Sequence, residues 1–185
     1  MNSLVLRLNQ FVFLTVRVIV KCNQCPCFNA YSLYFYAYSI LKVNHHDLKT
    51  LLYESTSSKE LEDYECQSCK KKTVAINTIT FDCEPNILIL HIQKADNRVQ
   101  HEEELILDKA KITDIGKTGI DKHIGIKYKL FGIVHYYGNY AAGHYFAFAK
   151  HGDSWWKVDD GHMKKVERLS KEHVMPFMLF YEKIY

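Results

Sequence analysis

The sequence predicts an α+β domain built on a mainly antiparallel sheet with short helical cover. Aromatic residues make up 14% of the chain, with thirteen Tyr and ten Phe, and aromatic and β-branched residues favour strands. Helical patterns are confined to two short segments, whereas strand-like segments recur along the whole chain. Runs of strands with few helices between them indicate an α+β fold rather than alternating βα units.

The overall composition is that of a globular protein that can bury a core. The chain has 185 residues, of which 48% are hydrophobic and 24% charged, both ordinary values. This length predicts one domain, or one domain with a protruding subregion. Three prolines and eight glycines argue against low complexity, and a net charge of +3 is too small to indicate nucleic-acid binding by itself.

The first apolar segment, residues 11–20, reads FVFLTVRVIV and is rich in Val, Ile and Phe. Arg17 interrupts it, and Lys21 follows where a signal peptide would have small residues. It is also too short for a membrane span, so we expect a strand. Without an export signal, the six cysteines are expected in a reducing compartment, cytoplasm or nucleus, where metal ligation outranks disulfides.

The other elements follow from local patterns. Leu48, Leu51 and Leu52 have helical spacing and predict a helix over residues 46–54. A capping-box pattern at residues 57–60 predicts a second short helix ending before Tyr64. Residues 93–127 are polar, and we expect their acidic run at 102–104 to be a solvated face. The predicted strands are residues 11–21, 31–41, 73–81, 86–92, 127–136, 144–150, 155–159 and 177–181.

Two C-x-x-C pairs predict a metal site: Cys22 with Cys25, and Cys66 with Cys69. Each pair can form a tight turn that presents two thiolates, and four thiolates make a closed tetrahedral zinc site. Thiolates are soft ligands, which favours zinc over magnesium or calcium. The alternative is four unrelated buried cysteines that behave as small hydrophobes. Two further cysteines, Cys27 and Cys83, lie outside the pattern and are expected to be core thiols.

A predicted hairpin carries a histidine and two aspartates near its open end. Reflection about the turn at residues 151–154 places position 144 opposite position 161. Asp159 then shares a face with His144, because side chains alternate along a strand. The Cα atoms of such diagonal neighbours lie ~7–8 Å apart, which allows a hydrogen bond between their side chains. Asp160 would point to the other face, unless a bulge inverts the choice. On geometry alone, a purely structural His–Asp pair is the favoured interpretation.

Several segments together resemble the His box of the ubiquitin-specific proteases, which are ubiquitin carboxyl-terminal hydrolases. The resemblance lies in residues 128–135, Gly143-His144-Tyr145, Trp156, Asp159-Asp160 and residues 178–181, in the family's order and at similar spacing. Residues 85–91 resemble a further family strand, and the two C-x-x-C pairs resemble its zinc-bearing fingers. The resemblance extends over residues 11–181, which is nearly the whole chain.

The resemblance implies a papain-like palm sheet with zinc-ribbon fingers. The fingers and their intervening helices would occupy about residues 11–85, and the palm with the His box about residues 86–185. By resemblance, His144 is the catalytic base and Asp159 orients it. His135, Gly143 and Tyr145 would then bind the Gly-Gly end of ubiquitin, and the four paired cysteines would hold a structural zinc ion.

The sequence also departs from the family pattern. The family's Cys box, with its nucleophile, precedes the first C-x-x-C pair by far more residues than are present here, and neither Cys27 nor Cys83 sits in a matching motif. Residues 93–95 read Gln-Lys-Ala where the family has Lys-Arg-Phe. The resemblance therefore implies a partial catalytic domain without the thumb half. A fragment, a truncated gene model, one part of a split enzyme and a degenerate paralogue all remain open.

Three functions follow as hypotheses. The first is a deubiquitinase that hydrolyses bonds at the C-terminal glycine of ubiquitin with a nucleophilic cysteine from outside this chain. The second is a catalytically inactive ubiquitin-binding or scaffold module. The third, a zinc-ribbon nucleic-acid binder, is disfavoured by the modest charge. The expected partners are ubiquitin or ubiquitinated proteins and the missing Cys-box half of the enzyme, with no nucleic acid and no membrane.

Overall fold

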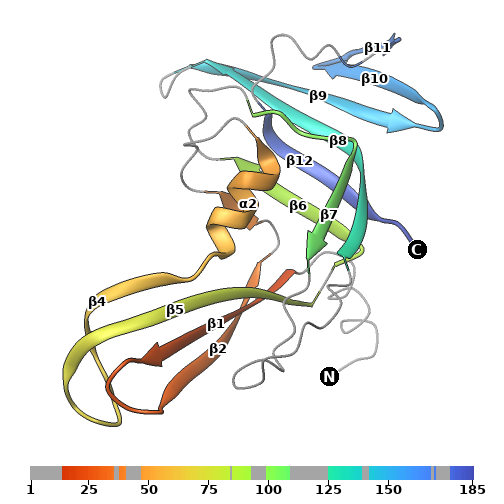
Figure 1. Ribbon diagram of the computed structural model, residues 1–185. Coiled ribbons are helices and arrows are strands. Elements are labelled where there is room, and N and C mark those ends of the chain that lie inside the picture. The colour runs from red at the N-terminus through yellow and green to blue at the C-terminus, as the bar shows by residue number, and fades with distance from the viewer. Residues whose placement is uncertain are drawn as a thin grey trace, which may run out of the picture.

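The computed structural model describes residues 14–35, 38–40, 47–83, 85–92, 99–108, 125–138, 142–167, 169 and 176–185. These residues form two sheets and one helix, α2 (Leu48–Thr56). Figure 1 shows the smaller sheet extending away from the larger one, with α2 beside the junction. The predicted α+β character, with antiparallel sheets and little helix, is confirmed.

The small sheet contains β1 (Leu14–Cys22), β2 (Phe28–Phe35), β4 (Lys59–Glu65) and β5 (Lys72–Cys83). Its order is β2-β1-β5-β4, and every neighbouring pair is antiparallel. Along β1, buried residues alternate with half-buried ones, from Leu14 through Val20. From Leu14 onward, β1 confirms the strand predicted at residues 11–21, and its alternation is that of a half-buried strand.

The large sheet contains the remaining strands. They are β3 (Tyr38–Ile40), β6 (Ile87–Ile92), β7 (Glu104–Asp108), β8 (Gly125–Gly138), β9 (Gly143–His151), β10 (Ser154–Asp159), β11 (His162–Val166) and β12 (Pro176–Lys183). The order is β11-β10-β9-β8-β12-β6-β3, and β7 pairs with β8 beside this path. The pair β3–β6 is parallel, and the other pairs of this sheet are antiparallel.

The core of the large sheet lies under β6, β8 and β12. Leu90, Tyr128, Leu179 and Tyr181 are each 0% exposed. Burying a tyrosine requires a partner for its hydroxyl group, and both rings have one. The Tyr128 hydroxyl donates to the carbonyl oxygen of Pro85 at 2.8 Å, and the Tyr181 hydroxyl donates to the carbonyl oxygen of Glu102 at 3.0 Å. The central strands are therefore tied to the segments that precede β6 and β7.

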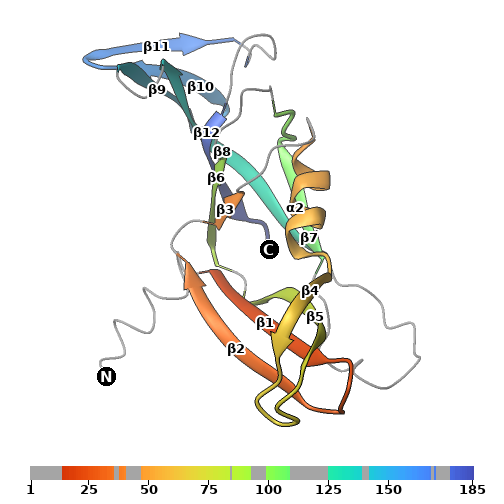
Figure 2. The ribbon, with the colours of Figure 1, turned by 90° about the vertical axis from the view of Figure 1, so that its left-hand side faces the viewer.

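Helix α2 lies against β5 and β3, where the two sheets meet, as Figure 2 also shows. Leu48, Leu51 and Leu52 are its buried residues, which confirms the helix predicted from their spacing. Asp47 caps the N-terminus: its Oδ2 accepts hydrogen bonds from the Thr50 backbone N–H at 2.9 Å and from the Thr50 hydroxyl at 2.8 Å. These bonds satisfy one donor that the first helical turn leaves without an intrahelical partner.

The prediction of a second helix, starting at residues 57–60, is wrong. Residues 59–65 form β4 instead, which pairs with β5. Helix α2 ends at Ser57, whose backbone is extended, and Ser58 shares a hydrogen bond with Thr78 of β5 at 2.9 Å. The capping-box pattern is a local signal, and pairing with the longer β5 outweighed it.

Other differences concern strands that local patterns did not predict or divided differently. The acidic run at residues 102–104 leads directly into β7, and β11 follows the second aspartate. The strand predicted at 31–41 is divided into β2, in the small sheet, and β3, in the large one. Residues 93–95, where the sequence departs from the family motif, lie outside the described residues. Among the described helices, none is long and apolar enough to cross a membrane.

We predict that Asp47→Ala lowers the free energy of unfolding by about 1 kcal/mol, because it removes the N-cap acceptor. The hydrogen bonds from the Thr50 N–H and hydroxyl hold the pKa of Asp47 below its usual value. The charged cap is therefore favoured by folding, and its stabilisation is lost as the pH falls through the folded pKa. Urea unfolding at neutral and acidic pH should show the difference between variant and parent shrinking in acid.

Asp47→Asn is the matched control, because asparagine keeps an acceptor oxygen and caps about as well as aspartate. It should unfold close to the parent at neutral pH. A loss equal to that of the alanine variant would contradict the assignment of Asp47 as the N-cap.

Candidate functional site

The open end of the β9–β10 hairpin brings together the residues singled out in the sequence. His151 pairs with Ser154 across a two-residue turn, and the register continues to Val158 opposite Ala147. Gly152, in this turn, has φ +58°, a conformation that glycine adopts without strain. Extending the register places position 144 opposite position 161, as the reflection about the turn predicted.

His144 is hydrogen-bonded to Asp159. The distance between His144 Nε2 and Asp159 Oδ1 is 2.6 Å, and the side chains are 48% and 32% exposed. The predicted choice of Asp159 over Asp160 is thus confirmed. Asp160 begins the turn to β11 with φ +50°, and in the described part of the chain no hydrogen bond joins it to the imidazole.

This contact fixes the chemical form of the ring. An ionised carboxylate only accepts hydrogen bonds, so Nε2 must carry the proton that it donates to Asp159. Nδ1 of the neutral ring then has a lone pair that can accept a proton from a further group. The described residues offer no hydrogen-bond partner for Nδ1. The arrangement is that of a base with one nitrogen oriented and the other available.

Asp159 also binds a lysine that the sequence did not single out. The Nζ of Lys157 lies 2.6 Å from Asp159 Oδ2, so both carboxylate oxygens have a partner. The hydrogen bond from Lys157, followed by that from His144, holds the pKa of Asp159 below its usual value. Strand periodicity could have identified this residue, because Lys157 lies two positions before Asp159 on the same face.

The three residues predicted to bind substrate do not share the surroundings of His144. His135 is only 2% exposed and packs against the rings of Phe146 and Phe148. Its ring centroid lies 5.1 Å from that of Phe146 and 5.4 Å from that of Phe148. It pairs with Phe146 across the strands and so shares the face of His144. His135 is therefore covered by the two phenylalanine rings and is not exposed on this face.

Tyr145 and Gly143 belong to the opposite face from His144, because successive residues of a strand alternate. Tyr145 is half exposed, and its ring contacts those of Tyr136 and Phe177. The distances between ring centroids are 4.7 Å to Tyr136 and 5.4 Å to Phe177. A Cβ atom at position 143 would lie 2.1 Å from the Tyr136 hydroxyl oxygen. Glycine is required there because the Tyr136 ring occupies the space of any side chain.

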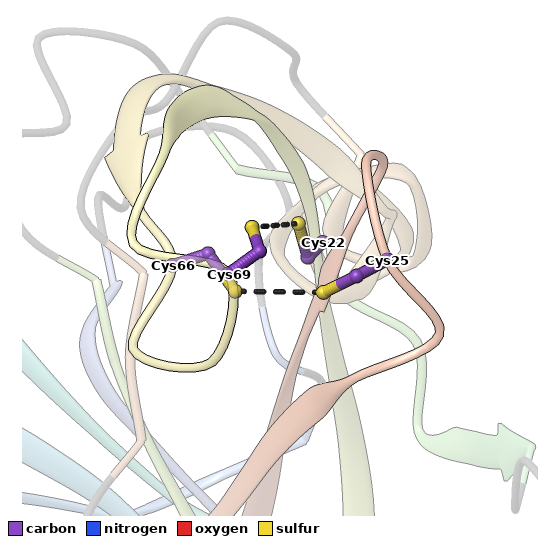
Figure 3. Close-up of side chains that lie close together, drawn as sticks. All are labelled: Cys22, Cys25, Cys66 and Cys69. Carbon is purple, nitrogen blue, oxygen red and sulfur yellow. Dashed lines mark hydrogen bonds between the residues drawn. The ribbon is translucent and has the colours of Figure 1, made fainter.

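The four cysteines of the two C-x-x-C pairs gather at the far end of the small sheet (Figure 3). Cys22 ends β1 and Cys25 lies in the β1–β2 connection, whereas Cys66 and Cys69 lie in the β4–β5 connection. Sγ of Cys22 lies 3.9 Å from Sγ of Cys69, and Sγ of Cys25 lies 3.7 Å from Sγ of Cys66. All four sulfur atoms lie within 4.8 Å of one another.

Backbone N–H groups surround these sulfur atoms. The N–H of Gln24 donates to Cys22 Sγ at 3.3 Å. Hydrogen bonds from the N–H groups of Cys69 and Ser68 lower the pKa of the Cys66 thiol to about 6. Donors of this kind favour the thiolate, which is the form that binds a metal ion.

The spacing of the sulfur atoms fits a tetrahedral ion. A Zn–S bond of about 2.3 Å implies a separation of about 3.8 Å between sulfur atoms at tetrahedral angles. Two of the separations, 3.7 and 3.9 Å, bracket this value. The two turns also match each other, because the N–H of Cys22 donates to the Cys27 carbonyl and the N–H of Cys66 to the Lys71 carbonyl. The donor set and its geometry therefore suit one metal ion.

In Figures 1 and 2, the ends of the small sheet at the β1–β2 and β4–β5 connections lie far from the β9–β10 hairpin, which carries His144 and Asp159. The described cysteine side chains are those of the cluster and Cys27, which lies next to it in the β1–β2 connection. The side chain of Cys83 is outside the described residues. No cysteine side chain in the described part of the chain is therefore near His144.

Comparisons with known proteins agree on one family. Residues 14–181 match the family model described as ubiquitin carboxyl-terminal hydrolase. The chain is 26% identical to ubiquitin carboxyl-terminal hydrolase 23 of Arabidopsis thaliana over 176 residues, which is 90% of this chain and 20% of the relative. It is also 26% identical to ubiquitin carboxyl-terminal hydrolase 4 of Candida glabrata, over 89% of this chain and 21% of that relative.

A solved structure has the same fold. The SAGA Ubp8/Sgf11/Sus1/Sgf73 DUB module bound to ubiquitin aldehyde matches with a TM-score of 0.82 at 21% identity. The match covers 95% of this chain and 42% of the chain in that structure. This chain thus spans about a fifth of the length of the two curated relatives. Because the family model covers most of its residues, the chain belongs to the ubiquitin carboxyl-terminal hydrolase family.

Proposed function

We propose that this chain supplies the catalytic histidine and its orienting aspartate to a ubiquitin-specific cysteine protease. The observation that carries the proposal is the His144–Asp159 hydrogen bond of 2.6 Å, which leaves Nδ1 available as a base. The reaction is thiol-dependent hydrolysis of the bond at the C-terminal glycine of ubiquitin. The nucleophilic cysteine comes from sequence outside these residues.

In the proposed reaction, Nδ1 of His144 takes the proton of the thiol. The thiolate then attacks the carbonyl carbon of the terminal glycine, and the imidazolium returns the proton to the departing amine. Water, activated by the same nitrogen, hydrolyses the resulting thioester and regenerates the thiol. Asp159 keeps the ring in the required tautomer and stabilises the imidazolium.

Ubiquitin is the proposed partner, as itself or attached to other proteins. The family assignment supports this, and so does the neighbouring fold with its bound ubiquitin aldehyde. Gly143 and Tyr145 precede and follow His144 and are exposed, so both are proposed contacts for the Gly-Gly end of ubiquitin. His135 would support this region from beneath, through its contact with Phe146.

We further propose that Cys22, Cys25, Cys66 and Cys69 hold one structural zinc ion. Four protein ligands close the tetrahedral shell, so the ion has no position for a substrate and would act only in folding. It would join the ends of two hairpins that are separate in the sequence. The sulfur separations and the N–H donors around the thiols support this assignment.

The alternative is a catalytically inactive ubiquitin-binding or scaffold module. One observation favours it: the described cysteine side chains belong to the cluster or its adjoining connection, and none of them comes from the sheet that carries His144. The two candidates differ in whether His144 affects turnover once a nucleophile is supplied. They do not differ in the proposed zinc site.

We predict one zinc ion per chain in the purified protein, measured by elemental analysis. The double variant Cys66→Ser/Cys69→Ser should lose it, because two thiolate ligands are removed. Cys27→Ser is the matched control and should retain zinc, since Cys27 is not among the four clustered sulfur atoms. Metal binding is coupled to folding, so chelation should increase hydrogen exchange in the small sheet more than in β8 and β12. Zinc near zero in the parent, or full retention in the double variant, would exclude this site.

We predict that the 185-residue chain alone does not release the fluorophore from a ubiquitin C-terminal amide. General-base catalysis contributes ~10²–10⁴-fold by itself, and each missing oxyanion donor costs ~10²–10³-fold in rate. Turnover should appear when the Cys-box half is fused in cis. It should vanish in His144→Ala and persist in His151→Ala, a control at the other end of β9.

Two results would decide against the proposed function. Robust turnover by the isolated chain that depends on His144 would mean that one of its own cysteines is the nucleophile. Turnover of the fused protein that survives His144→Ala would mean that His144 is not the base. Ubiquitin binding by the fused protein without any turnover would favour the scaffold alternative.

A further inference from the structure

Lys157 lies between the aromatic floor of the His144 face and the carboxylate of Asp159. Its Nζ is 2.6 Å from Asp159 Oδ2 and 4.6 Å from the centre of the Phe146 ring. Phe148 is directly opposite Lys157 in the register of β9 and β10, so Phe146 is its diagonal neighbour. A cation over an aromatic face is attracted by the ring, which directs the ammonium toward the open end of the hairpin.

A second lysine on the other flank acts in the same direction. Lys164 of β11 is directly opposite Lys157, and the two side chains share a face. Like charges directly opposite each other repel. The ammonium of Lys157 is therefore favoured away from β11 and toward the Asp159 carboxylate.

The position of Asp159 leaves its carboxylate weakly constrained unless a partner holds it. It is the last residue of β10, and Asp160 leaves the strand in a left-handed conformation. The side chain is about one-third exposed, so water can compete for its oxygens. The groups around it that carry or gain charge are His144 on β9, Lys157, the adjacent Asp160, and His162 and Lys164 on β11.

We propose that Lys157 is a positioning residue, whose ammonium holds one oxygen of Asp159 so that the other oxygen faces Nε2 of His144. With both oxygens engaged, the carboxylate has one orientation, and that orientation places the acceptor in line with the imidazole N–H. Its relevance to catalysis rests on the proposed function, but the contact itself can be tested in the chain without any turnover.

The test is nuclear magnetic resonance on the full 185-residue chain, comparing Lys157→Met with Lys164→Met. Both variants remove one positive charge from the same face of the sheet, but only the first removes a contact with Asp159. Three quantities are measured: the Hα–Hβ couplings of Asp159, which report its χ1 rotamer, the exchange of the His144 Nε2 proton with water, and the pKa of Asp159.

In Lys157→Met, the Asp159 couplings should average over rotamers, and the Nε2 proton should exchange several-fold faster. The pKa of Asp159 should rise, because its hydrogen bond with Lys157 is the largest cause of its lowered value. Lys164→Met should leave all three close to the parent, and Lys157→Arg should restore them. If Lys157→Met does not fold, Lys157→Gln is measured in the same way.

Two outcomes would overturn the proposal. A single Asp159 rotamer with an equally protected Nε2 proton in Lys157→Met would show that His144 alone holds the carboxylate. Equal effects of Lys157→Met and Lys164→Met would show that the charge of the surface matters and the contact does not. Neither outcome depends on whether the chain takes part in ubiquitin hydrolysis, so this test and that of the proposed function fail separately.

Discussion

The antiparallel register between β9 and β10 determines which carboxylate meets His144. A turn of only Gly152 and Asp153 separates the paired residues His151 and Ser154. Side chains alternate with period 2, so a slip of one residue would exchange the faces of the strand. A slip that put Asp160 in the place of Asp159 would also put Val158 in the place of Lys157 and turn Lys157 to the other side. The His144–Asp159–Lys157 arrangement therefore depends on one hairpin register.

The rest of the large sheet keeps this hairpin in place. One edge of β8 pairs with β9 along its second half and with β7 along its first half, while the other edge pairs with β12. His135, buried beneath Phe146 and Phe148, connects the face of His144 to this support. The end of the small sheet instead brings together the four thiols that we propose to hold zinc. Its stability is thus expected to follow metal chemistry, and that of the hairpin to follow strand pairing.

Local patterns predicted the elements whose signals are complete within the segment. The spacing of Leu48, Leu51 and Leu52 gave the helix, and reflection about residues 151–154 gave the partner of His144. The same parity applies to Lys157, two residues before Asp159, but a lysine on a strand is usually solvated, so the sequence offered no reason to single it out. Lys157 was therefore missed because of its residue type, although the strand geometry needed to place it was already available.

Where prediction failed, the deciding contacts came from distant segments. The capping-box pattern at residues 57–60 is a valid helix start, but β5 lies alongside and provides a ladder of backbone hydrogen bonds. Likewise Leu105, Ile106 and Leu107 of β7 form only a short apolar run in a polar stretch, and the pairing of β7 with β8 is not visible within the segment. The surroundings of His135 and Tyr145 depended on the β8–β9 register, which no local pattern specifies.

Through its hydrogen bond, Asp159 and not Asp160 determines which nitrogen of His144 carries the proton. The most direct measurement is the imidazole nitrogen spectrum of the neutral ring in Asp159→Asn and Asp160→Asn. Asparagine can donate as well as accept, so replacing an orienting carboxylate can leave the histidine in the wrong tautomer. We expect Asp159→Asn to move the proton from Nε2 toward Nδ1 and Asp160→Asn to leave it on Nε2. A tautomer that changes in Asp160→Asn and not in Asp159→Asn would show that Asp159 does not orient the ring.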